Sequence, residues 1–273
     1  MKDITPSKEP QIPRREFFTK LFQWAVGLVV FFKKNFSLAG ITNFTLSGTS
    51  SGFVNGTNLN FANVSDPYSG NVVLLLYADS FTDQKGKSIT NSGTVSLNSS
   101  VKKYGTSSFY FAGNNYVYAT STSTDFNYGA GNFTIEFMVY PLSGPVSSYN
   151  PTFFTNHGDG DWNSSGTGIR IHHQYTIFGG SFPWITHSPA IQNNVWTHYA
   201  LVRNGNTLTV FINGQAAGNC TASGNLGADA DRIALATSDG VTSGGREFLN
   251  GYIDNVRITK GIARYTASFT IGG

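Results

Sequence analysis

The chain has 273 residues, of which 40% are hydrophobic, 14% aromatic and only 12% charged. This length and apolar content are sufficient for one large domain with a sizeable core. Residues 1–40 hold seven Lys/Arg and three acids, a net charge of +4, whereas the other 233 residues hold eleven Lys/Arg and twelve acids, a net charge of −1. The body of the chain therefore offers no basic groove for nucleic acid. The single cysteine, Cys220, excludes an intrachain disulfide.

Residues 1–40 predict a basic, partly helical segment, because the apolar run 21–32 lies between Arg14-Arg15 and Lys33-Lys34. A helix of this length reaches about 18 Å, short of the ~30 Å hydrocarbon core, so a membrane span is not expected. Three hypotheses remain: an anchor that docks into a larger assembly, a twin-arginine export signal cleaved after Ala39, or a helix on a membrane surface. We favour the anchor. Its docking residues would be Arg14, Arg15, Phe17, Phe18, Leu21 and Trp24.

Residues 41–65 predict a Gly/Ser/Asn-rich connector with a short strand at 57–61, and residues 66–273 predict a β-sandwich. The continuous apolar run 72–77 is typical of a buried strand. Short alternating segments follow, separated by turn residues, as in sandwiches. The further predicted strands are 95–97, 107–111, 116–118, 133–140, 152–156, 168–174, 176–178, 196–203, 208–212, 233–236 and 251–258.

Two Asn-Gly pairs punctuate the segment 196–215. Asn-Gly between alternating apolar runs predicts a hairpin with a type I′ turn, in which both central residues have positive φ. We therefore expect one turn at Asn204-Gly205 and a second at Asn213-Gly214. Trp196 alternates with apolar partners in the first strand of this segment, and we expect it in the core.

Across residues 66–270 several motifs follow one another in an order that resembles the laminin-G-like family. These are 105–109 (Gly-Thr-Ser-Ser-Phe), 133–137 (Phe-Thr-Ile-Glu-Phe), 196–203 (Trp-Thr-His-Tyr-Ala-Leu-Val-Arg) and 259–265 (Thr-Lys-Gly-Ile-Ala-Arg-Tyr). The resemblance implies an all-β, concanavalin A-like antiparallel jelly-roll sandwich. It is strongest to the versions in bacteriophage structural proteins, where such domains decorate capsids or form tail appendages. Related domains bind glycans or proteins, often with calcium, and others are purely structural.

Glycosidases share this architecture, and they normally need two carboxylates that face each other. The chain has four glutamates, and Glu136 has no acidic neighbour on its predicted strand. We therefore expect no enzymatic activity.

Two acidic pairs are candidate calcium ligands. Asp159 and Asp161 alternate with Asn163 as in an oxygen-rich calcium loop, although Ser164 and Arg170 stand where such a loop has Gly and Glu. Asp79 and Asp83 form the second pair. For both pairs, the alternative is that the side chains cap turns.

A candidate ligand site lies in the longest irregular stretch, 145–190, because loops on a rigid scaffold commonly carry binding residues. Aromatic faces here could stack on sugars, and Asn could bind hydroxyls; the alternative is that the rings plug the sandwich edge. The candidate residues are Trp162, Asn163, Tyr175, Phe182 and Trp184.

The sequence thus favours a non-enzymatic virion-surface protein, a capsid decoration or tail appendage, that displays a lectin-like module. Its expected partners are other virion proteins through residues 1–40 and a glycan or host-surface ligand, with homo-oligomer formation left open. Calcium is the one candidate cofactor. The alternatives are a secreted or periplasmic bacterial glycan-binding protein with a twin-arginine-like signal, and a structural spacer without a ligand.

Overall fold

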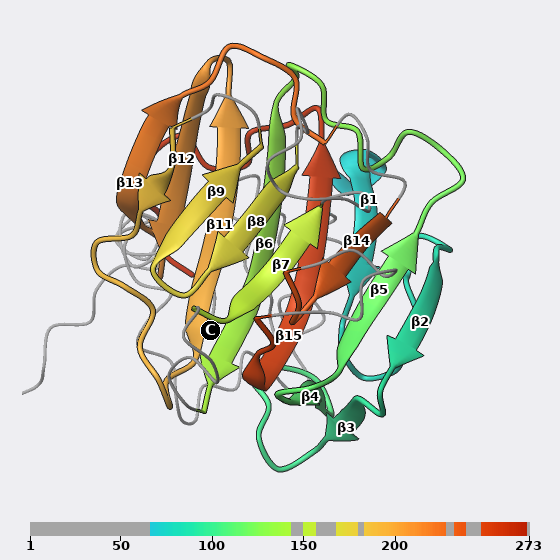
Figure 1. Cartoon of the computed structure of the whole chain (residues 1–273). Coiled ribbons are helices and arrows are strands. Elements are labelled where there is room, and N and C mark those ends of the chain that lie inside the picture. The colour runs from blue at the N-terminus through green and yellow to red at the C-terminus, as the bar shows by residue number, and fades with distance from the viewer. Residues whose placement is uncertain are drawn as a thin grey trace, which may run out of the picture. The chain divides into compact units, whose positions relative to one another are not determined.

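Two antiparallel β-sheets face each other in the computed structural model (Figure 1), which describes residues 66–142, 150–156, 168–179, 183–227, 232–238 and 247–271. The described residues contain no α-helix; a short 3-10 turn, η1 (Ser69–Asn71), precedes the first strand. This arrangement confirms the predicted concanavalin A-like jelly roll. Within these residues, no helix is both long and apolar enough to cross a membrane.

Sheet A is the larger sheet, with the strand order β13-β12-β11-β6-β15-β4-β3 and with β1 paired to β15. Its central strands, β6 and β15, therefore come from distant parts of the sequence. The strands are β1 (Val72–Leu76), β3 (Ser96–Asn98), β4 (Ser108–Ala112), β6 (Phe133–Pro141), β11 (Thr197–Asn204), β12 (Thr207–Ile212), β13 (Gln215–Thr221) and β15 (Asn250–Lys260).

Sheet B has the strand order β10-β9-β8-β7-β14-β5-β2. It lies in front of sheet A in Figure 1. Its strands are β2 (Ser88–Ser92), β5 (Tyr116–Thr120), β7 (Thr152–Asn156), β8 (Ile169–His172), β9 (Tyr175–Phe178), β10 (Ile185–Thr186) and β14 (Arg232–Leu235).

The core fills the space between the sheets. Alternate residues of a strand share a face, so Ile135, Phe137 and Val139 of β6 all point inward, where Phe137 meets Phe153 of sheet B at a ring-centroid distance of 6.4 Å. Each such side chain stabilises the fold by about 1.5–3 kcal/mol when it is fully buried. The core explains the apolar alternation that the sequence shows.

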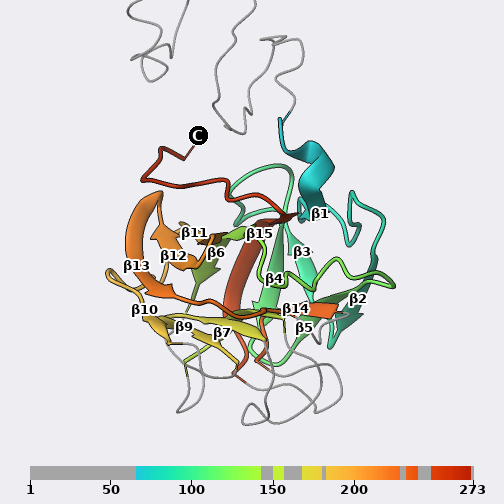
Figure 2. The same cartoon turned by 90° about the horizontal axis from the view of Figure 1, so that it is seen from above.

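The outer face of sheet A is covered in part by the C-terminal tail, residues 261–271. The tail passes over the sheet on the side away from sheet B (Figure 2). Tyr265 and Phe269 of the tail pack on Ala200, Val202 and Phe211 of the sheet. Strands β6 and β15, at the centre of the sheet, are buried on both faces.

One of the two predicted turns is confirmed and the other is shifted. Asn213 and Gly214 have φ values of 50° and 76°, as a type I′ turn requires. In the first hairpin, Asn204 pairs with Thr207 as the last residue of β11, so the turn residues are Gly205 and Asn206. The prediction of a turn centred on Asn204-Gly205 was therefore wrong by one residue.

Strands β2, β10 and β13 were not predicted, because β2 and β13 are mainly polar and β10 has two residues. Trp196 also differs from its prediction. It is only partly buried and contacts Tyr140, at a centroid distance of 5.5 Å, outside the main core. The alternating pattern placed it correctly on one face of the sheet but could not say which face.

The variant Gly214→Ala tests how closely the C-terminal tail approaches the sheet. A Cβ at this position would clash with the carbonyl oxygen of Phe269, whereas a Cβ at Gly205 would meet nothing within 4 Å. Both glycines have positive φ, so each alanine variant loses about 1–2 kcal/mol of unfolding free energy through backbone strain. We expect Gly214→Ala to lose about 1–3 kcal/mol more through the clash. Chemical denaturation measures both losses, and equal losses would contradict the close packing of the tail.

Candidate functional site

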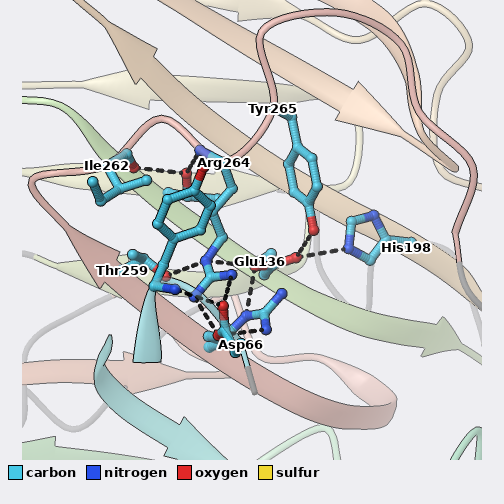
Figure 3. A network of polar contacts seen from close by, with 10 residues as sticks. Asp66, Glu136, His198, Thr259, Ile262, Arg264 and Tyr265 are labelled. Atoms are coloured by element: carbon cyan, nitrogen blue, oxygen red, sulfur yellow. Dashed lines mark hydrogen bonds and ion pairs between the residues drawn. The ribbon is translucent and has the colours of Figure 1, made fainter. Parts of the chain in front are cut away.

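A buried ionic network joins β6, β11, β15 and the C-terminal tail on the outer face of sheet A (Figure 3). Glu136 lies at its centre: Arg257 Nε donates to Oε1 at 2.8 Å, and Tyr265 Oη donates to Oε2 at 2.7 Å. His198 Nε2 lies 3.3 Å from Oε2. These partners come together because Glu136 is opposite Ala200 on one side and Arg257 on the other.

A second carboxylate closes the network. Asp66 accepts hydrogen bonds from Arg264 Nη1 at 3.0 Å and Nη2 at 2.7 Å, a bidentate pair, and it also contacts Arg257. Arg264 Nε in turn donates to Thr259 Oγ1. Two arginines thus connect two carboxylates, which secures the tail to the strands beneath it.

The electrostatics of this network do not suit acid–base catalysis. Burial alone would raise the pKa of Glu136, but Arg257 and His198 outweigh it and hold the pKa far below its usual range. Burial likewise opposes ionisation of Asp66, and Arg264 still lowers its pKa. A general acid needs a raised pKa so that it keeps its proton. Both carboxylates are therefore suited to holding the tail in place rather than to donating protons.

Asp79 and Asp83, the second predicted calcium pair, both accept hydrogen bonds from backbone amides. Asp79 Oδ1 accepts from the backbone N–H groups of Thr106 and Ser107, and Asp83 accepts from Leu75 and Lys87. Such bonds are typical of turn capping. In the described part of the chain, no three His, Cys, Asp or Glu side chains group in a way that could hold a metal. Calcium stays a prediction.

Tyr175 and Trp184, two of the predicted ligand residues, are brought together at the β9–β10 edge of sheet B. Their rings stack with centroids 5.6 Å apart and planes 20° apart. Trp184 is 59% exposed, the highest value among the exposed large hydrophobic residues of the described chain. Tyr175 lies beneath it and also contacts His172, at a centroid distance of 4.7 Å. The pair forms a supported aromatic surface that faces solvent.

Polar side chains that the sequence did not single out lie beside this pair. Thr152 Oγ1 donates to Glu247 Oε2 at 3.2 Å, and His172 Nδ1 lies 3.8 Å from the same oxygen. Burial lowers the pKa of His172 to about 3, so its ring is neutral at pH 7. Arg170 lies 3.8 Å from Glu247. Strand pairing sets Thr152 opposite His172, and the backbone N–H of Thr152 donates to the carbonyl of Glu247, which sequence spacing does not reveal.

The other predicted site residues lie outside the described residues. They are the loop residues Asp159, Asp161, Trp162, Asn163 and Phe182, and the anchor residues Arg14, Arg15, Phe17, Phe18, Leu21 and Trp24.

Residues 111–263 match the model of a protein family, Laminin_G_3, described as the concanavalin A-like lectin/glucanases superfamily. The chain belongs to this family. The predicted resemblance to laminin-G-like domains is thereby confirmed. No curated protein matches the sequence of this Laminin_G_3 chain.

Solved structures share the fold at low sequence identity. Domain 4 of AbnA, a GH43 extracellular arabinanase from Geobacillus stearothermophilus solved with arabinotriose, is 18% identical with a TM-score of 0.54, covering 71% of this chain and 94% of its own. A structure of botulinum neurotoxin type C, whose cell entry depends on two ganglioside molecules, is 16% identical with a TM-score of 0.52. The binding domain of botulinum neurotoxin DC in complex with SialylT gives the same identity and TM-score.

This Laminin_G_3 chain spans about half the length of both toxin chains, 49% in each case, with 71% of its own residues covered. At these identities the likeness shows the fold alone, which can host many unrelated functions.

Glu136→Gln tests whether the ionic network is structural. Removing the carboxylate charge takes away the 2.8 Å ion pair of the buried Arg257, and we expect a loss of about 3–5 kcal/mol in the free energy of unfolding at pH 7. Because the folded-state pKa of Glu136 is lowered, its contribution is complete above about pH 4.3, the unfolded pKa, and falls as the pH decreases below it. The variant should therefore lose less stability than the wild type between pH 7 and pH 3. Parallel pH dependences measured by denaturant unfolding would contradict this role.

Proposed function

We propose that this chain is a non-enzymatic carbohydrate-binding module whose primary ligand surface is the stacked pair Tyr175–Trp184. The observation that carries the proposal is the exposed Trp184 ring, which lies on a second aromatic ring. Keeping a large apolar ring exposed to water is less favourable than covering it. Contiguous exposed apolar surface therefore commonly marks a binding site. The C–H face of a sugar covers such a ring while its hydroxyls remain available for hydrogen bonds.

The neighbouring polar side chains support the aromatic pair from behind. Thr152 and His172 are fully buried, and His172 contacts Tyr175. Glu247, which is partly exposed, supplies the carboxylate of this group that can reach a ligand hydroxyl. Sugar sites commonly combine an apolar surface with a few polar groups that fix orientation. Relatives of the same fold support this ligand class: one was solved with arabinotriose, and another is from a toxin that depends on gangliosides.

The non-enzymatic part of the proposal rests on the Glu136 network. Glycoside hydrolysis pairs a carboxylic acid that has kept its proton with a second carboxylate. Glu136 and Asp66 are both ion-paired with arginine, and both have a lowered pKa. Neither is therefore in the protonation state that the acid role needs.

We further propose that the module is displayed on a virion surface, as a capsid decoration or tail appendage, and that residues 1–40 dock it to other virion proteins. The support is the basic and apolar composition of residues 14–34, which suits burial against a partner. A secreted bacterial protein with a cleaved twin-arginine-like signal is the alternative placement. A spacer without a ligand is the alternative function.

Trp184→Ala tests the ligand surface. Affinity electrophoresis of the full chain in gels containing soluble arabinan, β-glucan or a sialylated glycan identifies a polysaccharide that retards the wild type. For that polysaccharide, we expect the dissociation constant to rise about tenfold or more in the variant, equivalent to about 1.4 kcal/mol, because the stacking surface is lost.

Tyr77→Ala is the matched control, since Tyr77 is an exposed aromatic residue, 39% exposed, at the end of β1 in the other sheet. It should migrate like the wild type. Equal retardation of the wild type and Trp184→Ala would exclude this surface, and no retardation by any of the three polysaccharides would favour the spacer.

Substitutions that introduce a charge into the predicted anchor test whether the protein is displayed on a virion. Phe17→Asp and Trp24→Asp should abolish incorporation into particles while the sandwich stays folded, because a buried docking surface does not tolerate an unpaired carboxylate. Phe44→Asp, in the connector, is the control. Incorporation and intact mass are measured on particles from the natural source. Normal incorporation of both anchor variants would contradict the placement, and a mass loss corresponding to cleavage after Ala39 would support export.

A further inference from the structure

A row of aromatic side chains crosses the outer face of sheet A at the end that lies beyond the C-terminal tail's contacts with Ala200 and Phe211. Tyr140 of β6 is opposite Tyr252 of β15, and Tyr252 is opposite Tyr110 of β4. Trp196, directly before β11, completes the row. The successive ring centroids are 5.5, 5.9 and 5.1 Å apart.

The row combines apolar rings with polar tips. Tyr110, Tyr140 and Trp196 are half-buried, whereas Tyr252 is 8% exposed between its two neighbours. The phenol groups lie close enough for Tyr110 and Tyr140 to add to the effect of burial in raising the pKa of Tyr252. Neighbouring strands are about 4.8 Å apart, so a row over four strand positions extends about 14 Å. Its length exceeds one sugar ring.

A small pocket adjoins this row on the same face. Met138, which precedes Tyr140 by two residues on β6 and so shares its face, lines the pocket. The other lining residues are Tyr104, Glu136, His198, Asn255 and Arg257, and Tyr265, Phe269, Thr270 and Ile271 of the tail. The cavity volume is about 30 Å³. This is room for a few water molecules, or for a hydroxyl or hydroxymethyl group, and not for a sugar ring.

Two residues of the pocket keep buried polar atoms without a hydrogen-bond partner in the described part of the chain: Nδ2 of Asn255 and Nδ1 of His198. The two residues are only 8% and 7% exposed. Buried polar groups in proteins are nearly always satisfied, so these two atoms lack a partner that a water molecule or a ligand hydroxyl would supply. The ionic charges around the pocket cancel, because Arg257 is paired with Glu136. The missing partner is therefore expected to be neutral and able to hydrogen-bond.

We propose that the aromatic row and this pocket form a second binding surface, for a neutral oligosaccharide whose rings lie along the row and one of whose hydroxyl groups enters the pocket. The surface is on the opposite sheet from Tyr175–Trp184, so it goes beyond the primary site. Aromatic surface and hydrogen-bonding groups meet here as ligand sites require. An anionic ligand would find no unpaired arginine in the pocket.

The test is ¹H–¹⁵N NMR of the full chain titrated with cellotetraose, arabinotriose and sialyllactose. A neutral probe should shift the Trp196 indole and the Asn255 side-chain amide signals, in the wild type and equally in Trp184→Ala. Asn255→Gly removes the amide and suits the positive φ of 48° at this position. Asn255→Gly should weaken the affinity for the neutral probe about tenfold or more. Without ligand, the NMR signals of the aromatic row should keep their native positions in this variant.

The outcomes separate the two surfaces. Shifts that persist in Trp184→Ala support the second surface even if the primary site fails. Shifts that disappear in Trp184→Ala would overturn the second surface and leave the primary site. No shift of Trp196 and Asn255 with either neutral probe would overturn it as well, since the pocket would then hold only water. Tyr140→Phe, which keeps the ring, guards against loss of folding: unchanged affinity in both this variant and Asn255→Gly would contradict the proposed hydrogen bonds.

Discussion

The buried carboxylate of Glu136 is the interaction on which the outer face of sheet A depends. A charge in the interior is costly unless opposite charges and hydrogen bonds compensate it. Here the compensation comes from β15 through Arg257, from β11 through His198, and from the C-terminal tail through Tyr265. The tail therefore cannot leave the sheet without exposing or unpairing a charge, and its aromatic residues cover Ala200, Val202 and Phe211 of β11 and β12.

This clamp divides the sheet into a closed and an open part. Where the tail lies, the carboxylate of Glu136 is buried and its pKa is lowered. Two positions further along β6, Met138 lines the pocket together with the tail residues Phe269 and Thr270, and two positions further again Tyr140 joins the aromatic row. The residues that lock the tail thus also define the wall of the pocket. Folding stability and the proposed second ligand surface share the same strand.

The two aromatic surfaces differ in how they are built. Tyr175 and Trp184 are near-parallel rings at a sheet edge, with one ring largely in solvent. The row on sheet A is tilted or edge-to-face between neighbours and is mostly half-buried. Edge-to-face rings stabilise one another as well as contacting a ligand. The first surface is therefore suited to stacking on one sugar face, and the second to guiding a longer chain with its tyrosine hydroxyl groups.

The sequence by itself determined the sandwich, most of its strands, the turn at Asn213-Gly214 and the family, because alternation and turn chemistry are local properties. It also identified Tyr175 and Trp184 as ligand candidates. It could not pair Glu136 with Arg257, place Trp196 on the outer face, or join Tyr110 to Tyr252. These contacts depend on strand order and on the path of the tail, and the side-chain period of two fixes only which residues share a face. Only the tertiary structure decided which face is covered and which is open.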